Sequence, residues 1–249
     1  MKKVLPGKTD VEEKGKFMEA DCSIFLCRTP HALGPEWVWG RKLCAEFLSE
    51  GNRNIPLRIV EHAPPFSVRD VLVSESALIG VVLDDGLLWG PLGWETLRQK
   101  LVQIPSLAVI GPVSNEATVR EQQCAPPFPY QTPSALRLAC LAQCQLYHNQ
   151  WQETFALDPF AFLVRRSSLL TLDPELSLTQ VPSSLALQGG VLGVALDTYV
   201  HRYRLCTSYH ALICKSEFRE TLPAFSTLAV RPEHLAPRLK LVKIAWSWG

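Results

Sequence analysis

The sequence lacks an excess of charge of either sign: 25 Lys and Arg stand against 24 Asp and Glu, which leaves a formal net charge of +1 over 249 residues. Such a chain has no overall positive field to attract phosphate backbones, and it shows no local basic patch. Nucleic acid is therefore not an expected partner. With 47% apolar and 20% charged residues, and neither internal repeats nor low-complexity tracts, the composition is that of an ordinary folded protein.

The sequence also lacks the apolar stretches that signal export or membrane insertion. Residues 1–20 are charged throughout and read as a mobile polar leader. The longest uncharged stretch, residues 176–196, is interrupted by polar residues, a proline and the pair Gly189-Gly190, so we expect it to be folded rather than transmembrane. Without a secretion signal, the eight cysteines are expected to be reduced thiols in a cytoplasmic protein.

Several common catalytic motifs are missing. The chain has no Gly-x-Ser-x-Gly nucleophile elbow, no dinucleotide fingerprint and no phosphate loop with lysine. It also has no Cys-x-x-Cys pair, although two ladders at helical spacing contain residue types that bind zinc. These ladders are Cys140, Cys144 and His148, and Cys206, His210 and Cys214. Helix packing is the simpler account of both, because cysteine is among the most buried residue types.

Short apolar runs alternate with amphipathic stretches along most of the chain. We expect strands at residues 23–27, 57–60, 77–83, 107–110, 160–164 and 193–203, and helices at residues 35–51, 94–102 and 134–155. The apolar runs are continuous rather than alternating, which is typical of a parallel sheet covered by helices on both faces. The sequence therefore predicts an α/β fold.

Polar residues stand at the carboxyl ends of the expected strands, where ligands bind in open parallel sheets. They are Thr29 to His31, Glu61-His62, Asp84-Asp85 and Ser114-Asn115. An acidic pair at a strand end can chelate a hard divalent cation, which can in turn bridge two phosphates. By residue type alone, Asp84-Asp85 is also a common way to begin a turn.

Three blocks give the sequence a resemblance to family-two glycosyltransferases of the GT-A fold. Residues 77–117 contain ALIGVVLDDG, a Gly-Trp-led helix and a strand ending in GPVSN, residues 146–176 contain a strand ending in Arg-Arg, and residues 193–203 read GVALDTYVHRY. The resemblance covers residues 55–203 and extends faintly back to the run at 23–27. It implies a Rossmann-like GT-A domain over residues 21–215, with a C-terminal extension at 216–249.

The resemblance also assigns site residues. It implies that the donor, a nucleotide-diphosphate sugar, is held by Thr29, Glu61, Asp84, Ser114 and Asn115, and that Asp85 and His201 hold a divalent cation, Mn2+ or Mg2+. The chain departs from the family pattern in having Glu61-His62 instead of Asp-Asn, Gly86 instead of a third acid, and about two extra residues before Gly93.

The largest departure concerns the general base that inverting transfer requires. In the family this base comes from an acidic cluster, but residues 177–190 of this chain contain no Asp or Glu. Asp173 and Glu175 are the nearest acids and are the expected catalytic residues.

Two functions therefore stay open. One is metal-assisted transfer of a sugar to an unknown acceptor, glycan or protein. The other is a catalytically degenerate homologue that binds nucleotides or proteins, with the C-terminal tail from Pro223 as a site for a partner or a second copy.

Overall fold

A computed structural model of the chain describes residues 21–28, 44–45, 48, 55–84, 86–130 and 132–202. Its strands are β1 (Cys22–Arg28), β2 (Leu57–Glu61), β3 (Leu78–Val82), β4 (Leu87–Trp89), β5 (Leu107–Ser114), β6 (Trp151–Thr154), β7 (Ala161–Arg165) and β8 (Val191–Arg202). Its helices are α2 (Val68–Leu72), α3 (Gly93–Gln103), α4 (Pro133–Leu146), α5 (Arg166–Leu169) and α6 (Val181–Leu187), with short 3-10 turns at Arg120–Gln122 and Leu178–Gln180.

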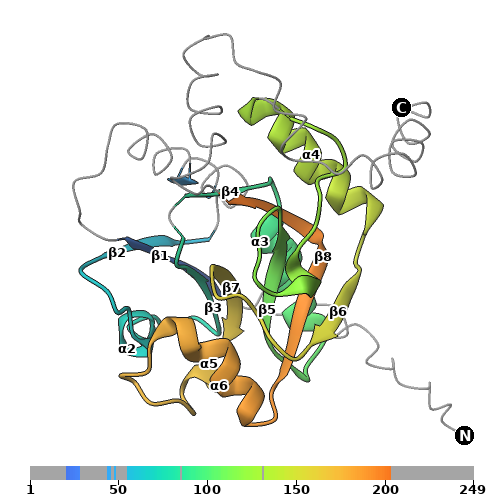
Figure 1. The fold of residues 1–249 in the computed structure, drawn as a ribbon. Helices are drawn as coiled ribbons and strands as arrows, with labels where there is room; N and C mark the ends of the chain where they lie inside the picture. The colour runs from blue at the N-terminus through green and yellow to red at the C-terminus, as the bar shows by residue number, and fades with distance from the viewer. Residues whose placement is uncertain are drawn as a thin grey trace, which may run out of the picture.

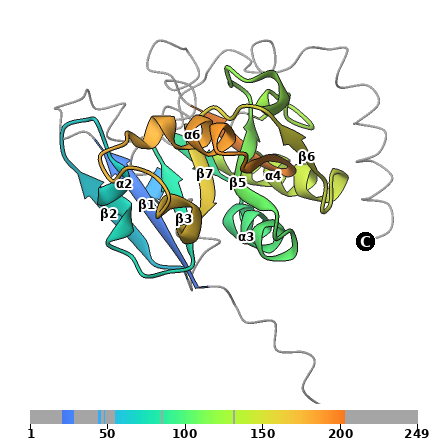
Figure 2. The same ribbon diagram turned by 90° about the horizontal axis from the view of Figure 1, so that it is seen from below.

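The strands form one eight-stranded sheet in the order β2-β1-β3-β7-β5-β8-β4, and β6 also pairs with β8 (Figure 1). Strands β1, β2, β3, β5 and β8 run in one direction, and β4, β6 and β7 run in the other. In Figure 2, α3 lies below the strands and α6 above them. The expected α/β class, with a sheet in which most strands point the same way, is confirmed.

Strand β8 pairs with three other strands of the sheet, β4, β5 and β6. Along one edge it pairs with β5, and along the other it pairs first with β6 and then with β4. Opposite β5 its register shifts, because Pro112 faces Ala195 whereas Val113 faces Tyr199. Residues 196–198 therefore bulge out of the ladder, and the carboxylate of Asp197 in this bulge bonds to Lys100 of α3 at 2.5 Å.

Apolar strands and a pair of tryptophans form the core. All five residues of β3 are buried, as expected for a strand covered on both faces. Trp89 of β4 and Trp94 of α3 stack with ring centroids 4.2 Å apart. Gly80 makes room for this pair, since a Cβ there would lie 2.8 Å from the Trp94 ring. The described residues contain no helix that is both long enough and apolar enough to span a membrane.

Two sequence expectations about elements are corrected. The long helix ends at Leu146 rather than continuing to Phe155, because Asn149 adopts a positive φ of 58° and the chain then pairs as β6. The Gly- and Trp-rich stretch after Asp85 contains strand β4, which is not among the strands expected from the sequence. Most of the helix expected at 35–51, the leader at 1–20 and the extension at 216–249 lie outside the described residues.

Candidate functional site

The carboxyl ends of the parallel strands meet at one edge of the sheet, which we call the rim. Asp84 follows β3, Ser114 ends β5, Asn115 comes directly after it, and Arg202 ends β8. Strand β7 runs the opposite way, so Asp158, which precedes it, reaches the same edge. The rim thus gathers side chains from four stretches of sequence that lie far apart along the chain.

The guanidinium of Arg202 lies between two carboxylates of the rim. Its Nε donates to Asp84 Oδ2 and its Nη1 donates to Asp158 Oδ2, each at 3.1 Å. The three side chains are only 12%, 17% and 9% exposed for Arg202, Asp84 and Asp158. Nη1 also donates to the carbonyl oxygen of Glu116 at 2.9 Å, and the guanidinium lies 4.6 Å from the ring centroid of Phe160. Arg202 is therefore anchored on several sides.

Asn115 and Ser114 hold the backbone of Arg202 in place. Asn115 Oδ1 accepts the backbone N–H of Arg202 at 2.8 Å, and Asn115 Nδ2 donates to the Arg202 carbonyl at 3.4 Å. Ser114 Oγ donates to Asn115 Oδ1 at 3.2 Å and accepts the backbone N–H of Glu116 at 3.3 Å. Ser114 and Asn115, which were both expected to contact the nucleotide sugar, thus connect the carboxyl ends of β5 and β8.

Asp158 is a rim residue that the sequence analysis missed. Its Oδ2 accepts the backbone N–H of Thr118 at 2.9 Å and the Thr118 hydroxyl at 3.0 Å, besides Arg202. The Asp158 backbone N–H donates to Gln122 Oε1 at 2.5 Å. Asp158 stands before an apolar strand rather than after one, so the rule that selected strand ends passed over it.

The other expected donor residues lie on the same edge or outside the described part of the chain. Glu61, at the end of β2, is exposed and pairs in register with Arg28 of β1, which lies between β2 and β3. Asp84 accepts the backbone N–H of Gly86 through Oδ1 at 3.1 Å, a turn-forming contact. Thr29 and Asp85 are among the residues that the structure does not describe. Their assigned roles stay predictions.

His201, expected as a metal ligand, is fully buried. Its Nδ1 makes a short hydrogen bond with the Tyr130 hydroxyl, which lies 3.0 Å from the Tyr199 hydroxyl. Burial, with the neighbouring Tyr130, raises the pKa of Tyr199 well above its usual value. Because successive side chains of a strand point to opposite faces, His201 and Arg202 leave β8 in opposite directions.

The two expected catalytic acids lie beside α2, in the segment that follows α5. Strand β7 ends opposite the start of β3, where Arg165 faces Leu78, and the chain then leads through α5 to Asp173 and Glu175. There Asp173 Oδ1 accepts the backbone N–H of Glu175 at 2.9 Å, and Glu175 forms an ion pair with Arg69 of α2. Among the described residues, neither acid bonds to Asp84, Asp158 or Arg202, and their catalytic role stays a prediction.

The described residues do not fit a divalent cation. No three His, Cys, Asp or Glu side chains among them lie close enough together to hold a metal ion. Asp84 instead faces a guanidinium, and His201 points away from Arg202. The expected cation at Asp85 and His201 stays a prediction, since Asp85 is outside the described residues.

The zinc alternative finds no support among the described residues, because no three His, Cys, Asp or Glu side chains lie together there as metal ligands. Cys140 donates its Sγ hydrogen to the Tyr199 carbonyl at 3.4 Å, a packing role for a residue of the first zinc-like ladder. Burial raises the pKa of Cys140 above its usual value, and it raises the pKa of both Cys22 and Cys27 to about 12. The second ladder, at 206–214, lies outside the described residues.

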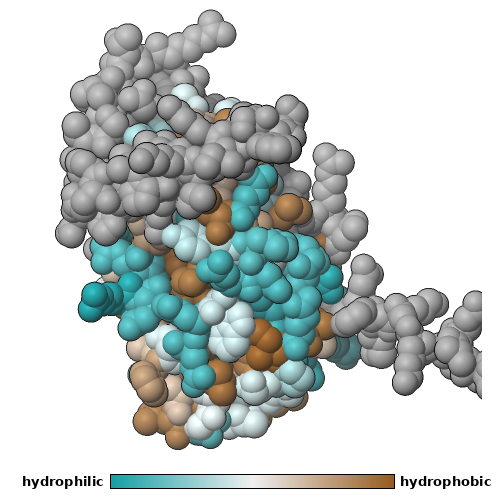
Figure 3. Space-filling view, turned by 90° about the vertical axis from the view of Figure 1, so that its right-hand side faces the viewer, coloured by the Kyte–Doolittle hydropathy of each residue, from teal (hydrophilic) through white to brown (hydrophobic). Residues whose placement is uncertain are grey.

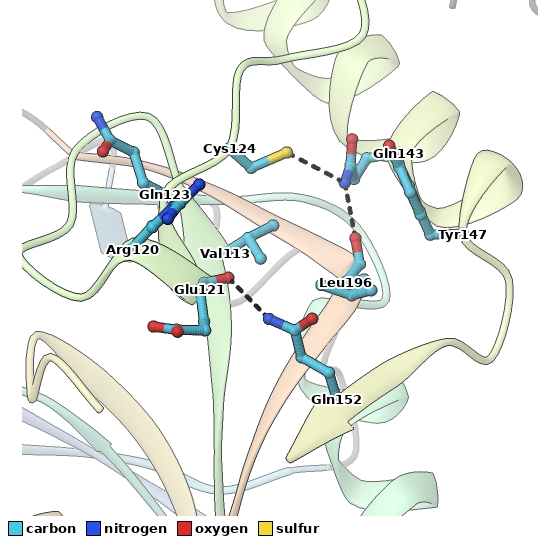
Figure 4. Close-up of a pocket in the computed structure, with 9 residues that line it drawn as sticks. All are labelled: Val113, Arg120, Glu121, Gln123, Cys124, Gln143, Tyr147, Gln152 and Leu196. Atoms are coloured by element: carbon cyan, nitrogen blue, oxygen red, sulfur yellow. Dashed lines mark hydrogen bonds between the residues drawn. The ribbon is translucent and has the colours of Figure 1, made fainter. Parts of the chain in front are cut away.

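A cavity of about 380 Å³ lies beside the rim, between α4, β6 and the middle of β8. Figure 4 shows its lining, which consists of Val113, Arg120, Glu121, Gln123, Cys124, Gln143, Tyr147, Gln152 and Leu196. Gln143 donates to the Leu196 carbonyl at 2.6 Å. The described surface on this side of the molecule is largely hydrophilic, with separated hydrophobic residues (Figure 3), so it shows no large apolar patch.

No protein-family model matches the chain, and no curated protein matches it. Among solved structures, it is similar to GalNAc-T7 with UDP, GalNAc and Mn2+, with a TM-score of 0.46 and 11% identity over 76% of this chain and 45% of that chain. It is also similar to CMP:2-keto-3-deoxy-manno-octonic acid synthetase complexed with CTP, with a TM-score of 0.37 and 10% identity over 80% of this chain and 97% of that chain. The chain thus spans less than half of the GalNAc-T7 chain. Similarities this distant assign no activity, and function has to be argued from the residues of this chain.

Proposed function

We propose that this chain is a GT-A-like domain that binds a nucleotide-diphosphate sugar at the rim and transfers its sugar to a glycan or protein acceptor. The observation that carries the proposal is the convergence of Glu61, Asp84, Ser114 and Asn115 on one edge of the sheet, at the ends of strands that point the same way. Loops and strand ends converge there, which is where open α/β sheets bind their ligands.

A second candidate is a homologue that binds the donor without transferring it. One observation favours it: Asp173 and Glu175, the acids nearest in sequence to the missing acidic cluster, bond to each other and to Arg69 of α2 rather than to the side chains of the rim. A general base must reach the acceptor proton directly or through one water. Contacts of the two acids with α2 rather than with the rim therefore favour binding without transfer.

Thermal unfolding of the full chain with a panel of nucleoside diphosphates and nucleotide sugars tests donor binding. A ligand that binds only the folded state stabilises it by about 2.7 kcal/mol at a concentration of 100 times its dissociation constant. We expect one nucleotide to raise the melting temperature of the wild type, and Asp84→Asn to reduce that rise. Glu153→Gln, on the exposed face of β6, is the matched control and should keep it.

The two candidates separate in a second measurement, which follows release of the nucleoside diphosphate from the bound nucleotide sugar in the presence of glycan and protein acceptors. Release that depends on acceptor supports transfer. Binding without release supports the second candidate, and a panel that produces no thermal shift at saturating concentration contradicts both.

A further inference from the structure

The rim contains two largely buried acidic side chains and one largely buried basic side chain that pairs with both of them. Two carboxylates, Asp84 and Asp158, share one guanidinium, and all three groups are largely withdrawn from solvent. Hard divalent cations bind carboxylate oxygens. At Asp84 both oxygens already accept hydrogen bonds, Oδ2 from Arg202 and Oδ1 from Gly86. At Asp158, Oδ2 accepts from Arg202 and twice from Thr118.

Arg202 is built into this position. Asn115 fixes its backbone through two hydrogen bonds, and the Glu116 carbonyl and the Phe160 ring hold its guanidinium. A metal ion at Asp84 would have to displace the guanidinium or lie beside a like charge with little water between them. The side chain already places one positive charge between the two acids without any metal, which leaves one net negative charge on the three groups.

The guanidinium also retains donors for a ligand. Its hydrogen bonds use Nε and Nη1, and among the described residues no group accepts a hydrogen bond from Nη2. A guanidinium binds phosphate oxygens well because its donors have a fixed planar geometry.

We infer that Arg202 is the cation of the rim: it pairs with both Asp84 and Asp158 at the place where a divalent metal ion would otherwise bind them, and it offers its Nη2 hydrogens to the phosphate oxygens of a nucleoside diphosphate. The part of this inference that concerns phosphate rests on the proposed function. The part that concerns the metal does not.

Binding of Mn2+ alone to the full chain, measured by titration calorimetry, tests the metal part. We expect wild-type binding of Mn2+ to be below the detection limit of the titration. Arg202→Gln should bind Mn2+ with an affinity at least tenfold above that limit, and the double variant R202Q/D84N should lose this binding. Arg202→Lys keeps a positive charge and should gain no Mn2+ binding, so it remains informative if R202Q is poorly folded. Arg69→Gln, at an exposed arginine that pairs with Glu175, is the control for losing one positive charge.

Two outcomes would overturn the metal part. One is a wild-type Mn2+ site that Asp84→Asn abolishes, which would also support the expected cation at Asp85 and His201. The other is a folded R202Q that gains no affinity, because the two acids would then not form a cation site.

The phosphate part is tested by repeating the nucleotide panel in EDTA and in Mn2+. The expected result is equal stabilisation of the wild type in both conditions, with an apparent affinity that R202Q reduces at least tenfold in EDTA. Stabilisation only in Mn2+ overturns the inference and keeps the proposed function. The absence of stabilisation in either condition contradicts the proposed function, while the Mn2+ titration still decides the role of Arg202.

Discussion

Lys100 and Asp197 form an ion pair that is almost completely buried, at 2% and 1% side-chain exposure. Burying two charges costs much of what their attraction returns, so such a pair adds little net stability. Removing one partner is a different matter, because it leaves a single charge without compensation in the interior. The pair therefore disfavours any packing in which the bulge of β8 and helix α3 do not meet, because Lys100 or Asp197 would then be buried without its partner.

We expect Lys100→Met to lower the free energy of unfolding by about 3–5 kcal/mol, since Asp197 would remain buried without its partner. Urea unfolding followed by circular dichroism measures this. The double variant Lys100→Met/Asp197→Leu should recover much of the loss.

The matched control is Arg98→Ala, which breaks the more exposed pair with Glu95 and should cost at most about 1 kcal/mol. If Lys100→Met lowered the free energy of unfolding by no more than this control, burial of the Lys100–Asp197 pair would not be the cause of the expected loss.

At the scale of elements, α4 packs on the sheet so closely that one glycine is required. A Cβ at Gly90 would lie 2.2 Å from the Cβ of Cys140 on α4, far inside contact distance. Gly90→Ala should force α4 away from the end of β4 and destabilise the protein by about 1–3 kcal/mol. Thermal unfolding measures the loss.

Cys140→Gly removes the opposing Cβ and provides the test of this contact. The double variant Gly90→Ala/Cys140→Gly should be more stable than the sum of the two single losses, because the two sites interact directly. Strict additivity would mean that the clash is not the cause.

Between β2 and α2 lies a histidine, His62, whose charge follows pH. His62 Nδ1 donates to the Ala63 carbonyl at 2.7 Å, and His62 Nε2 lies 3.2 Å from Asp70 Oδ2. The hydrogen bond to Ala63 is the largest cause that raises the pKa of His62 above its usual value, partial desolvation opposes it, and Asp70 adds to it. Asp70 also accepts the backbone N–H of Ser67, which begins the helix.

A raised folded-state pKa means that protonated His62 favours the folded state. This contribution is fully present below the unfolded pKa of about 6.5 and is lost as the pH rises through the higher folded value. We expect Asp70→Asn to lower the pKa of His62, measured by NMR titration with His62→Gln to assign the signal. Asparagine keeps an acceptor for Ser67, so an unchanged pKa in a folded variant would show that Asp70 does not contribute.

Sequence patterns predicted the strands and α3 well, since continuous apolar runs and amphipathic spacing depend only on local residues. They failed where contacts between residues far apart in the sequence determine which residues form a strand. Strand β5 continues through Gly111-Pro112 to Ser114 because β8 pairs beside it. Strand β4 is only three residues long, and the partner that makes it a strand is more than a hundred residues away.

The site was predicted in part for the same reason. The rule of strand ends selected Asp84, Ser114 and Asn115, which do lie together at the rim. The same rule applies to Arg202 at the end of the strand expected at 193–203, but the family pattern directed attention to His201, one residue before it. No local signal marks an arginine as the partner of acids 44 and 118 positions away in the chain.

At the scale of the whole molecule, antiparallel β7 joins two groups of parallel strands. It pairs with β3 on one side and with β5 on the other. The ends of β1, β2 and β3 and the ends of β5 and β8 therefore reach the same edge from different halves of the sheet. A ligand as long as a nucleotide sugar would contact both halves, and its binding would depend on how well they are assembled.

The position of β8 has a consequence for how the chain is made on the ribosome. Strands β4, β5 and β6 all pair with β8, which is the last element of the described part of the chain to be synthesised. While translation proceeds, the nascent chain holds β4 and one edge of β5 unpaired until residue 202 has been added. Exposed strand edges attract other chains, so this interval is when the protein would depend most on chaperones that bind nascent polypeptides.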